Sequence, residues 1–62
     1  MQRSLSEDIA ILEHKIVILR RELRNPHLHA DERSELEVDL ANAEEALRLF
    51  RKAFDLEQRI IS

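Results

Sequence analysis

Apolar side chains recur every three or four residues along the first third of the chain. They follow a 4-3-4-3-4 spacing at Leu5, Ile9, Leu12, Ile16, Leu19 and Leu23. This spacing places all six on one stripe of an α-helix. The segment from Ser4 to Glu7 matches a capping box, in which the Ser hydroxyl and the Glu carboxylate accept from backbone N–H groups of the first turn. We therefore predict that a helix begins at about Leu5.

The second half of the chain repeats the same pattern. Its 4-3-4-3-4 series consists of Leu36, Leu40, Ala43, Leu47, Phe50 and Phe54. Ile61 would continue this stripe after a lapse at Glu57. A second amphipathic helix, with an apolar stripe of the same kind, follows from this periodicity. Two pairs in this helix, Glu44 with Arg48 and Asp55 with Arg59, are four residues apart in the order that favours an ion pair.

A turn must separate the two segments, because Pro26 disfavours helical geometry at Asn25 and Asn is a common helix C-cap. The second helix starts with either His29 or Asp31 as its N-cap. The expected fold is thus all-α, a single helical-hairpin domain over residues 1–62. Its first helix covers about 5–24, its turn 25–29 and its second helix about 30–60.

The two predicted helices differ in length, since about 20 residues span ~30 Å and about 30 residues span ~45 Å. Antiparallel packing then leaves roughly ten residues of the second helix beyond the first. We expect the core inside the hairpin to consist of Leu12, Ile16, Leu19, Leu40, Leu47 and Phe50.

Many apolar residues fall outside these two stripes, and one hairpin has only one internal seam. A C2 dimer in which two hairpins form an antiparallel four-helix bundle is the simplest way to bury them. The predicted intermolecular surface consists of Ile11, Ile18, Leu49, Phe54, Leu56 and Ile60. A hairpin that docks on a different helical protein is the other version of this hypothesis.

The composition also suggests that the fold is stabilised by association with another chain. A chain of 62 residues buries a small core, and the absence of Cys excludes disulfides. The longest apolar runs are four residues, too short for a membrane span, so we expect a cytoplasmic protein without a membrane partner. The formal charge of -3 gives no global attraction to nucleic acid.

Few residues suggest chemistry. His27, His29 and Asp31 are of types that bind zinc or nickel, but their spacing matches no metal motif, and we interpret them as turn and capping residues. There is no nucleophile pattern and no phosphate-binding loop. The sequence predicts a non-enzymatic protein without metal or cofactor.

Nucleic-acid binding is the alternative from another functional class. Two basic clusters would carry it, namely Arg20, Arg21, Arg24 and Arg48, Arg51, Lys52. A dimer would double each cluster, and paired patches follow phosphates. Against this alternative, we expect the first cluster to face the acidic start of the second helix, and the chain has no Tyr or Trp for base stacking.

Overall fold

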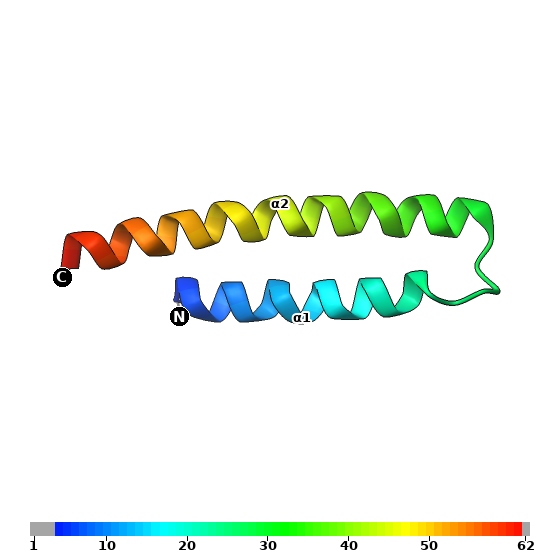
Figure 1. Ribbon diagram of the computed structural model, residues 1–62, viewed down its shortest axis with the longest axis horizontal. Helices are drawn as coiled ribbons and strands as arrows, with labels where there is room; N and C mark the ends of the chain where they lie inside the picture. The colour runs from blue at the N-terminus through cyan, green and yellow to red at the C-terminus, as the bar shows by residue number, and fades with distance from the viewer. Residues whose placement is uncertain (1–3, 62) are drawn as a thin grey trace.

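The protein is a hairpin of two antiparallel helices, seen side by side in Figure 1. The computed structural model describes the backbone of residues 4–61 and the side chains of residues 4–60. Helix α1 covers Leu5–Leu23 and helix α2 covers Ala30–Ile61. No strand occurs in this part of the chain, so the prediction of an all-α hairpin is confirmed.

Ser4 caps the N-terminus of α1 as predicted, but the second bond of the predicted capping box, from the Ser4 N–H to the Glu7 carboxylate, is not formed. Its backbone is extended, and its Oγ accepts a hydrogen bond of 3.2 Å from the backbone N–H of Glu7. The first turn also carries the acidic side chains of Glu7 and Asp8, which the positive end of the helix dipole favours. This end of α1 is therefore fixed by local sequence alone.

The turn between the helices is organised by Asn25. Its Oδ1 accepts from the N–H of His27 at 3.0 Å, which closes an Asx turn around Pro26. The C-cap of α1 is Arg24, in right-handed helical geometry, and no residue between 4 and 61 has a positive φ. Asn25 thus shapes the turn by its side chain and does not act as a left-handed C-cap.

Arg33 ties the start of α2 to the end of α1. Its Nη1 donates to the carbonyl oxygen of Leu23 at 3.0 Å, and its Nη2 donates to that of Asn25 at 3.4 Å. These carbonyl groups lie at a helix C-terminus, where the last carbonyl oxygens have no intrahelical N–H donor. Helix α2 begins at Ala30, so His29 occupies its N-cap position and Asp31 lies inside the first turn.

The core lies where the two predicted stripes meet. Four side chains are buried, and they come in equal number from each helix: Ile16, Leu19, Ala43 and Leu47. Partly buried side chains pack against them, namely Ile9, Leu12, Leu36 and Leu40. Five of the six predicted core residues belong to this cluster, whereas Phe50 is only half-buried and Ala43 is among the most buried.

Helix α2 is much longer than α1, with 32 residues against 19. In Figure 1 its last turns, orange to red, continue past the N-terminal end of α1, which confirms the predicted overhang. The hairpin is consequently 49 Å long and 19 by 18 Å across. The side chain of Ile61, which would continue the second stripe, lies outside the described residues.

Candidate association surface

One face of the hairpin is crossed by two ion pairs between the helices. Arg20 of α1 contacts Glu44 of α2 at 2.6 Å, and Arg51 of α2 contacts Glu13 of α1 at 2.7 Å. The residues along this face line a shallow groove, and we call it the ion-pair face: Glu13, Val17, Arg20, Glu44, Arg48 and Arg51. Charged side chains therefore cover this side of the core.

The hairpin leaves more large apolar side chains exposed than it buries. The exposed set consists of Ile11, Val17, Ile18, Val38, Leu49, Leu56 and Ile60. The last of these is 85% exposed and lies on the overhang of α2. Five of the six residues predicted to contact another molecule belong to this set, while Phe54 is half-buried at its stripe position.

Most of these exposed residues lie on the side opposite the ion-pair face. With 3.6 residues per turn, Ile11 and Ile18 lie on the flank of α1 that points away from Glu13 and Arg20. The same geometry puts a row of α2 on the flank away from its own ion-pairing residues. We call the combined surface the apolar face: Ile11, Ile18, Ala46, Leu49, Ala53, Leu56 and Ile60.

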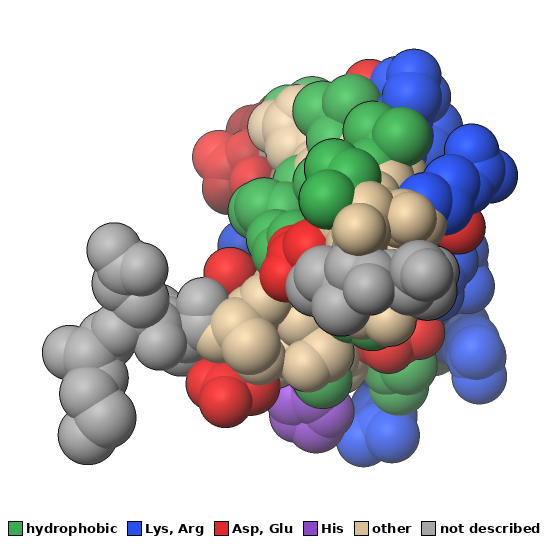
Figure 2. Space-filling model, turned by 90° about the vertical axis from the view of Figure 1, so that its left-hand side faces the viewer, with side chains coloured by type: hydrophobic (Ala, Val, Ile, Leu, Met, Phe, Trp, Pro, Cys, Tyr) green, Lys and Arg blue, Asp and Glu red, His purple; other side chains and the backbone are tan. Residues whose placement is uncertain are grey.

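Figure 2 views the hairpin from the end that carries the C-terminus of α2. Lys and Arg side chains gather on the right-hand side, whereas hydrophobic side chains gather toward the upper left. The view agrees with the positions that helical geometry gives to the two faces. Basic and apolar side chains therefore gather on different sides in this view, whereas acidic side chains lie on both sides.

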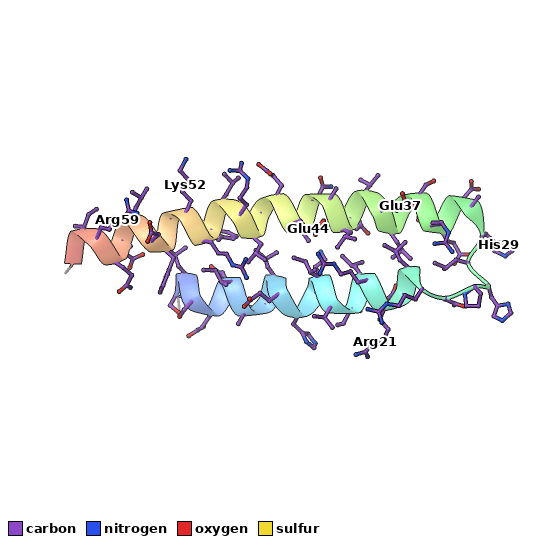
Figure 3. The ribbon with its side chains drawn as sticks, in the orientation of Figure 1. Arg21, His29, Glu37, Glu44, Lys52 and Arg59 are labelled. Carbon is purple, nitrogen blue, oxygen red and sulfur yellow. The ribbon has the colours of Figure 1, made fainter. Side chains whose placement is uncertain are left out.

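Most basic residues of the nucleic-acid alternative lie on the ion-pair side of the hairpin, where Lys and Arg side chains gather in Figure 2. Arg20, Arg48 and Arg51 each contact an acid. In Figure 3 Arg21 points away from α2 below α1, and Lys52 points away from α1 above α2. Arg21, Arg24 and Lys52 make no ion pair with any residue from 4 to 61.

Two predicted charge contacts turn out differently. Arg20 reaches Glu44 in the middle of α2, so the expected pairing with the acidic start of that helix is wrong for this residue. Because Glu44 is engaged by α1, Arg48 pairs with Glu45 instead of the predicted Glu44. The predicted pair of Asp55 and Arg59, four residues apart, is confirmed at 2.8 Å.

The Glu45–Arg48 pair is bidentate. The Nη2 and Nε of Arg48 donate to the two carboxylate oxygens of Glu45 at 2.6 and 3.2 Å. This hydrogen bonding, followed by the charge of the guanidinium, lowers the pKa of Glu45. The same two effects raise the pKa of Arg48. Both side chains of the pair are exposed to solvent, Arg48 at 61% and Glu45 at 58%.

The residues of the turn stay apart from the apolar face. His27, His29 and Asp31 are exposed, and His29 lies at the tip of the hairpin in Figure 3. No group of three metal-ligating side chains gathers within residues 4–60. Within the described chain, neither helix has a stretch long and apolar enough to cross a membrane.

Sequence reasoning missed the role of Arg33 and the Glu13–Arg51 ion pair. Arg33 is the single base among seven acids between residues 31 and 45. This isolated position in the sequence could have indicated that Arg33 has a specific contact. The ion pair joins residues 38 positions apart, and no local pattern marks it. Which residues of the two helices can form such a pair depends on how the helices are aligned along their axes.

Comparison with known proteins supplies no relative. No protein-family model matches the chain, and neither curated proteins nor solved structures show a significant match.

Proposed function

We propose that the hairpin is a non-enzymatic association module that pairs with a second copy of itself to form a four-helix bundle. One observation carries this proposal: seven large apolar side chains are exposed, while the buried core contains only four residues. Each large aliphatic side chain contributes about 1.5–3 kcal/mol when it is fully buried. Five of the seven lie on the apolar face, so a partner that covers this face would bury more large apolar side chains than the hairpin buries alone.

The dimensions of the hairpin support the same conclusion. Its radius of gyration is 14.6 Å, whereas a compact domain of this length has about 11 Å. Two packed helices leave every side chain within reach of solvent, and no side chain between residues 4 and 60 is less than 2% exposed. Two hairpins packed together form a four-helix bundle, in which each helix has two neighbours.

Thermal unfolding followed by circular dichroism tests this proposal. If folding is coupled to dimer formation, the midpoint temperature rises with protein concentration by mass action. A midpoint that stays the same over a hundredfold dilution of a well-folded chain contradicts the proposal. A chain that is poorly helical at every concentration would favour the adaptor version, in which a different helical protein supplies the missing face.

The nucleic-acid alternative has weaker support. Lys and Arg side chains gather on one side of the hairpin (Figure 2), but three of the six basic residues of this alternative are engaged by acids. Filter binding at low salt with single- and double-stranded nucleic acids separates the two functions, because phosphate contacts are strongest there. Retention that disappears when Arg21 and Arg24 are replaced by Gln would favour the alternative.

A further inference from the structure

We infer that the apolar face is covered by the apolar face of a second copy, with the two α2 helices antiparallel. This inference depends on the proposed self-association and adds to it a surface and an orientation. Three features of the hairpin carry it: the distribution of charge between its faces, the charge gradient along α2 and the extent of its exposed surface.

The ion-pair face is a poor docking surface. A partner there would have to displace or desolvate the Arg20–Glu44 and Glu13–Arg51 pairs, which costs free energy that new contacts must offset. The row along the apolar face contains only aliphatic side chains and includes Ala46 and Ala53, whose small side chains allow close approach of a neighbouring helix. The apolar face is therefore the side on which another helix packs.

The charge gradient along α2 favours one direction for a second copy over the other. Residues 31–45 contain seven acids and one base, whereas residues 46–60 contain four bases and two acids. The α2 residues of the apolar face all lie between 46 and 60, so two such rows packed antiparallel leave the acidic halves of the two α2 helices at opposite ends of the dimer. A parallel pair would put the two acidic halves side by side and would also align the two helix dipoles.

The exposed area matches the need of such a dimer. The hairpin exposes 5209 Å², whereas a folded monomer of 7.3 kDa exposes about 4200 Å². The excess of about 1000 Å² is close to the ~800 Å² per partner that a standard stable interface buries. Packing against one further copy would thus reduce the exposed area per chain to about the value of an ordinary folded monomer of this mass.

Spin labels in the turn test the orientation. The chain contains no Cys, so His27→Cys introduces a unique and exposed attachment site. In an antiparallel dimer the two turns lie at opposite ends, and the label separation is comparable with the 49 Å length of the hairpin or longer. A separation within roughly 25 Å overturns the inference, because it would require turns at the same end of helices packed about 8–10 Å apart.

Two neighbouring residues of α1 provide a matched test of the face. Ile18 belongs to the apolar face and Val17 to the ion-pair face, and both are exposed in the hairpin. Ile18→Glu is expected to raise the dissociation constant of the dimer at least about a hundredfold, since a buried carboxylate would lack a partner. Val17→Glu, beside Arg20 and Arg48, is expected to change it no more than about threefold.

The two experiments separate this inference from the proposed function. If no dimer of the unaltered chain forms at micromolar concentration, self-association itself fails. If a dimer forms but Val17→Glu dissociates it while Ile18→Glu does not, only the assigned face is wrong. Circular dichroism at high concentration shows that each variant is helical, and the spin-label distance remains decisive if Ile18→Glu does not fold.

Discussion

At the scale of single residues, Arg33 links the start of α2 to the end of α1. Its guanidinium donates to two carbonyl oxygens at the end of α1, those of Leu23 and Asn25. Both acceptors lie where the helix dipole places partial negative charge, which favours a cation. The Asx turn at Asn25 directs the chain back, and Arg33 then links that turn to the first turns of α2.

Replacing Arg33 by Ala should lower the free energy of unfolding by about 2 kcal/mol, because two charge-assisted hydrogen bonds are lost at a helix end. Urea denaturation measures the change. Arg21→Ala is the control, since this exposed residue makes no ion pair with residues 4–61 and should alter stability by less than about 0.5 kcal/mol. Equal effects of the two substitutions would mean that Arg33 acts only through its charge.

The bidentate pair on α2 gives a prediction about pH. In the folded protein the hydrogen bonds and charge of Arg48 lower the pKa of Glu45 below its ordinary value. The pair therefore stabilises the fold above the ordinary pKa of Glu, and that contribution is lost as the pH falls through the lowered pKa. Carboxyl titration by NMR should show this shift, and Arg48→Gln should remove it. An unaltered Glu45 titration in Arg48→Gln would rule out this cause.

At the scale of the helices, sequence periodicity predicted most of what the structure shows. Helix boundaries agree within one residue, and every described residue of both stripes is buried or half-buried. Such features depend on spacing within one segment, which is why they can be read locally. The expected Glu44–Arg48 contact was wrong because an arginine from the other helix, Arg20, takes Glu44. Contacts between helices depend on their axial alignment, which no local pattern specifies.

The packing of α1 against α2 can be tested at Leu47. This side chain is 9% exposed and packs in the buried cluster, so Leu47→Ala should cost about 2–5 kcal/mol of unfolding free energy. Val38→Ala is the control on the same helix, because Val38 is 58% exposed and has little packing to lose. Chemical denaturation measures the loss of unfolding free energy in each variant. Similar losses in the two variants would contradict the described core.

At the scale of the whole molecule, the hairpin is incomplete by itself. Its longer helix continues past its shorter one, and the apolar face and the overhang both present aliphatic side chains to solvent. The sequence predicted this surplus from the residues outside the two stripes. It could not predict that the surplus lies opposite two ion pairs, because that arrangement follows from the contacts of Glu13 and Arg20 with the other helix.

The overhang offers a test of assembly through Phe54. This residue is half-buried in the single hairpin, and a docked partner would cover it further. Phe54→Ala should then cost ~3 kcal/mol or more and shift the equilibrium toward unfolded chains. Thermal unfolding at fixed concentration measures the loss. An unchanged midpoint temperature would show that the overhang is frayed in solution and takes no part in association.

Sedimentation equilibrium of the unaltered chain tests the central claim most directly. Between about 1 and 100 µM, the account predicts a helical species with twice the 7.3 kDa mass of one chain, in reversible equilibrium with its dissociated form. A folded, helical monomer throughout this range would contradict it, because the apolar face would then be stable in water without a partner.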